Sequence, residues 1–63
     1  MKNNLQKIRW EKNWSQHQLA RISRVPQSVI SEIENGIKMN PNVYTALRLA
    51  KALSVSVEDI FIL

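Results

Sequence analysis

The chain has 63 residues, a formal net charge of +4 at pH 7 and no cysteine. This length suits one domain (residues 1–63) with a small core, and without disulfides or thiolate metal sites its stability must come from helix packing or oligomerisation. Because no apolar run reaches membrane-spanning length and no signal-peptide core follows the N-terminus, we expect a cytoplasmic protein that does not enter membranes.

The first two predicted helices are separated by a short connection. The first covers about residues 4–12, and Asn13 is expected as its left-handed C-terminal residue. The second covers about residues 15–22. Ser15 is a good N-cap, and Gln18 three residues later completes a capping box that satisfies free backbone donors.

A tight turn at residues 23–25 precedes a third predicted helix over about residues 26–35. Pro26 suits the first turn of this helix, because its φ is fixed and its missing N–H has no intrahelical partner there. Gly36 ends the helix by supplying the left-handed conformation. Residues 15–35 therefore form a predicted helix-turn-helix.

The third helix combines an apolar side with a polar one. Ile30 and Ile33 lie three residues apart and are expected to point inward. Gln27 can bond an adenine edge with both a donor and an acceptor, and Ser28 can bond bases or phosphate. Taken alone, these two residues favour ordinary caps and solubilising groups. After a helix and a turn in a basic chain, they indicate a helix that enters the DNA major groove.

The fourth predicted helix covers about residues 42–53, with Asn42 as its N-cap. Its apolar spacing predicts a core face made of Val43, Ala46, Leu47, Ala50 and Leu53. A fifth helix opens at Ser56, has Glu58 and Asp59 in its first turn where the helix dipole favours them, and runs to the C-terminus. The expected fold class is all-α with five helices.

Two long stretches of the chain lack acidic residues. Residues 12–31 carry Lys12, Arg21 and Arg24 without any carboxylate, and residues 37–57 are also free of acidic side chains. This distribution suits a polyanionic partner, although a net charge of this size is also usual for solubility.

An ordered set of residues runs through nearly the whole chain. It consists of Leu5, Ile8 and Arg9; Ser15-Gln16 and Leu19-Ala20; Ile30 and Ile33-Glu34-Asn35-Gly36; Asn40-Pro41; Leu49-Ala50-Lys51-Ala52-Leu53; and Val55-Ser56-Val57-Glu58-Asp59-Ile60-Phe61. This set resembles the Cro and phage-repressor family of transcriptional regulators, also called XRE-type domains. The resemblance implies a compact five-helix, lambda-repressor-like DNA-binding domain.

The resemblance also implies two groups of DNA contacts. The base-reading residues would be Gln27, Ser28, Val29, Ser31 and Glu32. The phosphate-contacting residues would be Ser15, Gln16, Lys38, Asn40 and Asn42. For Val29 a buried position is nearly as well supported as one at the groove edge, and Glu32 either accepts from cytosine or faces away from the phosphates.

Two further roles follow from the resemblance. Arg9 and Glu34 would pair across the first and third helices and fix the recognition helix, whereas two solvated charges would contribute only about 0–1 kcal/mol. The C-terminal residues would form a dimer interface, with Phe61 in the core and Ile62 and Leu63 at the contact. A partly buried or frayed tail is the alternative for this apolar end.

Four residues depart from the family pattern. Arg24 and Ser54 stand where glycine is usual, so both are expected at positive φ with some strain. Pro26 replaces the usual serine or threonine cap of the recognition helix. Trp10 replaces a polar residue and is either a local packing residue on the stems of Glu11 and Lys12 or a contact for a partner.

Enzyme chemistry is poorly supported, because His17 is the single histidine and one glycine cannot make a phosphate-binding loop. We expect no enzyme activity, cofactor, metal or small-molecule substrate. The sequence predicts a homodimeric repressor that binds a pseudo-palindromic double-stranded DNA operator through the major groove, with a protein antagonist as a possible further partner. The alternative is a helix-turn-helix module that binds protein, such as an antitoxin, antirepressor or adaptor.

Overall fold

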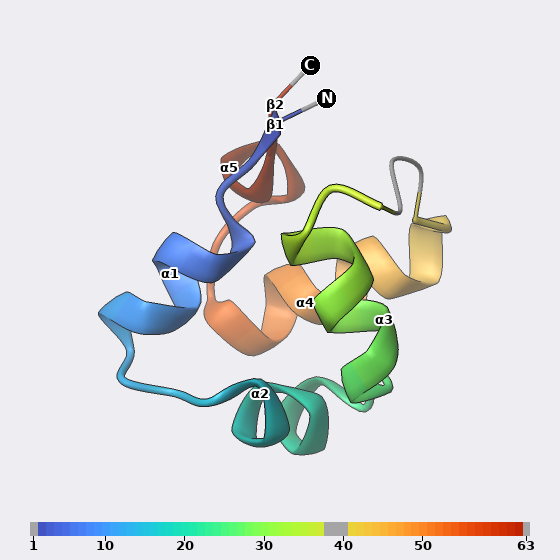
Figure 1. Ribbon diagram of the computed structural model, residues 1–63. Coiled ribbons are helices and arrows are strands. Elements are labelled where there is room, and N and C mark those ends of the chain that lie inside the picture. Colours follow the sequence, from blue (N-terminus) through green and yellow to red (C-terminus); the bar gives the residue numbers. More distant parts are fainter. Residues whose placement is uncertain (1, 38–40, 63) are drawn as a thin grey trace.

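The computed structural model describes residues 2–37 and 41–62, and within them five helices surround one small core (Figure 1). The helices are α1 (Leu5–Glu11), α2 (Gln16–Ser23), α3 (Gln27–Glu34), α4 (Val43–Leu53) and α5 (Val57–Ile60). Two short strands, β1 (Lys2–Asn3) and β2 (Phe61–Ile62), accompany them. The all-α prediction is confirmed, and the paired strands are an addition to it.

Side-chain caps begin three of the helices. The Ser15 hydroxyl accepts from the Gln18 N–H at 3.1 Å, and Gln18 Oε1 accepts from the Ser15 N–H at 2.7 Å, which confirms the predicted capping box. Asn42 Oδ1 accepts from the N–H three residues further along. Ser56 and Asp59 form a second capping box at α5. Each cap satisfies backbone donors that have no partner inside the helix.

Left-handed residues follow four of the helices, as predicted. Asn13, Arg24 and Ser54 have φ values of 59°, 62° and 58°. Gly36, at φ 75°, ends α3, where its N–H donates to the Ile33 carbonyl. Arginine and serine adopt this conformation at an energetic cost that glycine avoids, so Arg24 and Ser54 are positions of modest strain.

The core gathers one side of each helix. Its fully buried side chains are Leu5, Leu19, Ile30, Ile33, Leu49, Leu53 and Ile60. The predicted core face of α4 is wrong in part, because Val43 and Leu47 are exposed while Leu49 is fully buried. Ala46 and Leu53 are buried as predicted. The side of α4 that packs on α2 and α5 is thus rotated from the one inferred from the sequence.

The two ends of the described chain lie side by side, as Figure 1 shows. Lys2 pairs with Ile62 and Asn3 with Phe61 in an antiparallel ribbon. The predicted continuation of the fifth helix to the C-terminus is therefore wrong. Phe61 is extended, with φ −106° and ψ 113°, because its backbone pairs with β1 and does not continue the helix.

Asn3 links this ribbon to α3. Its Nδ2 donates to the Ile33 carbonyl at 2.9 Å, and its Oδ1 accepts from the Leu5 N–H at the start of α1.

Among the described residues, none of the helices is both long enough and apolar enough to cross a membrane.

Candidate nucleic-acid interface

The connection between α2 and α3 is held by a buried serine. Ser23 Oγ donates to the Leu19 carbonyl at 2.6 Å and accepts from the Val25 N–H at 3.3 Å. Arg24 makes the left-handed turn between them, and Pro26 occupies the N-cap of α3 without a side-chain cap. The turn is therefore set by local bonds, which fix the angle at which α3 leaves α2.

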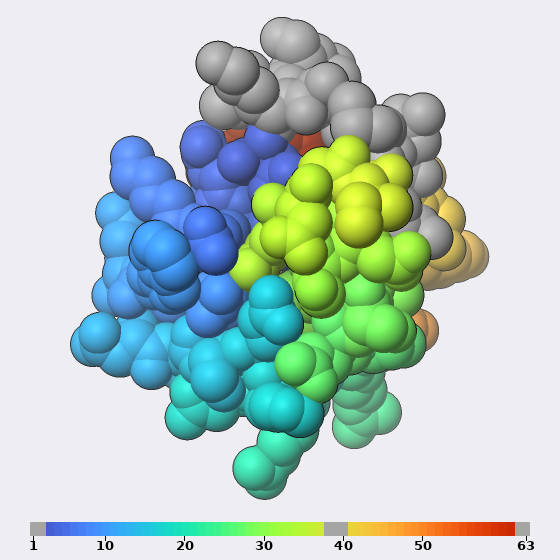
Figure 2. Space-filling view, in the orientation of Figure 1, coloured from blue at the N-terminus to red at the C-terminus, as the bar shows by residue number. Residues whose placement is uncertain are grey.

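The polar side of α3 faces outward while Ile30 and Ile33 are fully buried, as predicted. Of the predicted base-reading residues, Ser28 is exposed, and Gln27, Val29, Ser31 and Glu32 are half-buried. Val29 packs against the core, so its side chain is shared between the core and the surface. Figure 2 shows the face on which α1, α2 and α3 meet, in blue, cyan and green.

A chain of side-chain hydrogen bonds connects the predicted DNA contacts. Gln27 Nε2 donates to Gln16 Oε1 at 3.3 Å, and Gln16 Nε2 donates to Glu34 Oε1 at 3.0 Å. We call Arg9, Glu34, Gln16 and Gln27 the polar network. The sequence indicated each residue separately but not the bonds between them. Gln16 bonds to residues 11 and 18 positions away in the chain, and no local sequence pattern predicts contacts over such distances.

The predicted Arg9–Glu34 pair is confirmed as a buried, two-pronged ion pair. Arg9 Nε and Nη2 donate to the two carboxylate oxygens at 2.8 and 3.0 Å, and the side chains of Arg9 and Glu34 are only 7% and 1% exposed. Arg9 Nη1 also donates to the Trp14 carbonyl at 2.7 Å. The hydrogen bonds to Glu34 raise the pKa of Arg9 and outweigh the lowering by burial, so the guanidinium stays charged.

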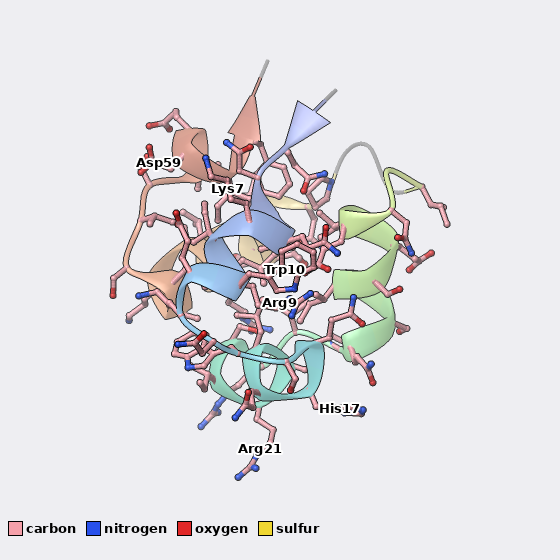
Figure 3. The ribbon with its side chains drawn as sticks, turned by 60° about the vertical axis from the view of Figure 1, so that its left-hand side comes forward. Lys7, Arg9, Trp10, His17, Arg21 and Asp59 are labelled. Atoms are coloured by element: carbon pink, nitrogen blue, oxygen red, sulfur yellow. The ribbon has the colours of Figure 1, made fainter. Side chains whose placement is uncertain are left out.

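Trp10 lies next to this pair (Figure 3). Its ring centroid is 6.0 Å from Arg9 Cζ, within the range of a cation–π contact, and the side chain is largely exposed. Trp10 therefore lies against Arg9, and not on Glu11 and Lys12 as the local-packing alternative had it, and most of its indole is at the surface.

The phosphate-contacting residues divide into three groups. Gln16 lies in the polar network, and Ser15 and Asn42 each use a side-chain oxygen to cap a helix. These caps use only the side-chain oxygens, so the Ser15 hydroxyl proton and the Asn42 amide N–H groups take no part in them. Lys38 and Asn40 lie outside the described residues.

The structure bears on one of the three predicted dimer residues. Phe61 is in the core, as expected, and only 8% exposed, so its side chain has little surface to offer a second subunit. Ile62 pairs through its backbone in β2, and Leu63 lies outside the described residues.

A separate group of exposed apolar side chains lies on the first turns of α4. They belong to Val43, Tyr44 and Leu47, which are 69%, 75% and 52% exposed, and we call them the α4 apolar face. The sequence pattern had assigned two of the three to the core. Monomeric proteins seldom leave large apolar side chains grouped at the surface, so this face is a candidate contact with another chain.

Across residues 2–37 and 41–62, no group of three or more histidine or acidic residues is placed to hold a metal ion.

Comparisons with known proteins agree with this geometry. The helix-turn-helix family model matches residues 5–60. An HTH-type transcriptional regulator from Methanocaldococcus jannaschii is 40% identical over 62 residues, which cover 98% of this chain and 92% of the relative. The crystal structure of the restriction-modification controller protein C.AhdI from Aeromonas hydrophila superimposes with a TM-score of 0.81 at 30% identity, covering 89% of this chain and 83% of that one.

Proposed function

This chain belongs to the helix-turn-helix family of DNA-binding transcription regulators, and we propose that it is a sequence-specific repressor that binds a pseudo-palindromic operator as a homodimer. In this proposal α3 enters the major groove, while the N-terminus of α2 and the loop before α4 contact the phosphates. Occupation of the operator would exclude RNA polymerase from the promoter.

The observation that carries the proposal is the polar network. Gln27, at the first position of α3, is bonded to Gln16, and through it to a buried ion pair that connects α1 and α3. A glutamine held in this way loses less conformational entropy on meeting a base than a freely rotating one. The network therefore supports Gln27 as a base reader and Gln16 as the adjacent residue that contacts a phosphate.

The α4 apolar face supports the homodimer. A two-fold axis through this face would bury Val43, Tyr44 and Leu47 against the same residues of the second copy, because a two-fold interface is self-complementary. The described domain measures 25 × 21 × 19 Å. Two such domains side by side can present their α3 helices to half-sites about 34–36 Å apart, one turn of DNA.

Selection of bound sites from a random duplex library tests the proposal. The expected result is a pseudo-palindromic motif, whose affinity falls steeply with salt because phosphate contacts release counterions. Gln27→Ala should relax the motif at one base pair in each half-site. Gln6→Ala, which changes an exposed glutamine of α1, is the matched control and should select the wild-type motif.

Two outcomes would contradict the proposal. One is the absence of any motif, with weak binding that vanishes with salt equally for all variants, since that is purely electrostatic contact. The other is a motif that survives Gln27→Ala unchanged. The first outcome would favour the alternative in which this domain binds protein.

A further inference from the structure

A hollow on the outer side of α2 takes no part in the proposed DNA contacts. It has a volume of about 370 Å³ and is lined by Trp14, Gln18, Arg21 and Ile22. Ile22 is 51% exposed, and Trp14 is half-buried against the core. The floor of the hollow therefore offers an aliphatic side chain and an indole, which suit a single apolar side chain of a partner.

The hollow faces away from α3. Residues 18, 21 and 22 lie about 140–240° around the helix from Gln16, at 100° per residue, and Gln16 is the residue of α2 that bonds to Gln27 and Glu34. Figure 3 shows Arg21 projecting from α2 on the side away from α1 and α3. A ligand in the hollow would leave the polar side of α3 accessible.

Positive charge surrounds this apolar floor. Lys12 Nζ lies 5.6 Å from the Trp14 ring centroid, and Arg21 is exposed at the rim. No acidic residue occurs in residues 12–31. A phosphate backbone would meet the charges but has no apolar group to place against Ile22 and Trp14, whereas an acidic peptide with one large aliphatic side chain can satisfy both.

We propose that this hollow docks an acidic segment of a different protein, with one aliphatic side chain against Trp14 and Ile22 and carboxylates beside Lys12 and Arg21. The contact area is small, so the complex is a weak and transient one. Because the hollow is separate from α3, the protein can hold this partner whether or not DNA is bound, and the inference does not depend on the proposed function.

Fluorescence of Trp14 gives a direct test. A Trp10→Phe variant leaves Trp14 as the single tryptophan, and the probe is a synthetic Asp-Glu-Asp-Leu-Asp-Glu-Asp peptide. We expect a saturable change in emission. A matched peptide with serine in place of leucine should bind more than tenfold more weakly, because the buried aliphatic side chain is lost.

Two variants locate the contact within the same experiment. Ile22→Ser should weaken binding of the leucine peptide severalfold, because it removes part of the apolar floor. Arg21→Gln should weaken it about threefold, as expected for one exposed ion pair. Arg48→Gln, which removes an exposed arginine of α4, is the control and should leave binding unchanged.

Three results would overturn the inference. The first is no saturable change below about 1 mM peptide, and the second is equal binding of the leucine and serine peptides. The third is a change in Trp14 emission on adding short duplex DNA that disappears in Arg21→Gln, which would make the hollow a nucleic-acid contact.

Discussion

The polar network and the α4 apolar face reverse the usual relation between polarity and burial. In the network, Arg9 and Glu34 carry full charges and yet are almost completely buried. On the α4 apolar face, three large apolar side chains are more than half exposed. Buried charges are costly unless they are paired, and Arg9 and Glu34 pair with each other inside the domain. An exposed apolar face has no such compensation within one chain, so its cost remains until another chain covers it.

The two regions contribute to different free energies. Every buried side-chain nitrogen or oxygen among the described residues has a hydrogen-bond partner, so the network is satisfied inside the domain and contributes to its folding. The α4 apolar face contributes little to the fold of one chain and becomes favourable only when it is covered. Substitutions in the two regions should therefore change different measured quantities.

The largest expected change in stability follows from breaking the polar network. Arg9→Ala should lower the free energy of unfolding by about 3–5 kcal/mol, because it leaves the Glu34 carboxylate buried and unpaired. DNA binding should weaken with it. Urea unfolding followed by circular dichroism measures the change, and Arg48→Ala, at an exposed site, should stay within about 0.5 kcal/mol of wild type. A loss below about 1 kcal/mol for Arg9→Ala would place the pair among ordinary surface ion pairs.

A comparable effect is expected on association at the α4 apolar face. Leu47→Ser should raise the dissociation constant of the proposed homodimer about a hundredfold, because in that dimer two leucine side chains would lose their buried contact. The stability of the monomer should barely change. Sedimentation equilibrium gives the dissociation constant, with Arg48→Ser as the neighbouring control. Unaltered association in Leu47→Ser would remove this face from the interface.

A smaller change in stability is expected at the start of α2, the helix that carries Gln16. Ser15→Ala should cost about 1 kcal/mol of stability, because the Gln18 N–H loses its capping acceptor. Ser56→Ala, which removes the equivalent cap of the four-residue α5, provides a second measurement of the same kind. If Ser15→Ala were neutral in thermal unfolding, the capping box would not hold this end of α2.

The smallest effect is a stabilisation. Ser54→Gly should raise the free energy of unfolding by less than about 1 kcal/mol, because glycine removes the cost of the left-handed conformation but loses more entropy on folding. Ser54→Ala keeps the Cβ atom and should give no gain. Thermal unfolding of the two variants distinguishes them, and a gain in both would exclude backbone strain as the cause.

Features decided by neighbouring residues could be predicted from the sequence. The Ser15 capping box and the left-handed Asn13 depend on one or two turns of chain, and both were confirmed. The positive φ of Arg24 and Ser54, also confirmed, was expected from family resemblance. The inward position of Ile30 and Ile33 also follows from spacing within one helix. The Arg9–Glu34 pair came from family resemblance, since its residues are 25 positions apart.

Features decided by tertiary packing could not be predicted from the sequence. In α4, apolar residues occupy more than one side of the helix, so periodicity could not choose between the side with Leu47 and the side with Leu49. The end of α5 depends on pairing of Phe61 with Asn3 across the whole chain. The bonds of Gln16 to Gln27 and Glu34 likewise require α2 and α3 to be already in place.

The proposed DNA recognition depends most on Gln27 as a base reader held by the polar network. The most direct test measures the affinities of wild type and Gln27→Ala for the selected operator and for every single-base variant of one half-site, at one salt concentration. The account predicts that Gln27→Ala loses about 1–3 kcal/mol on the operator and no longer discriminates at one base pair, while the penalties at other positions remain. An equal loss on all sequences, with discrimination intact at every position, would contradict it.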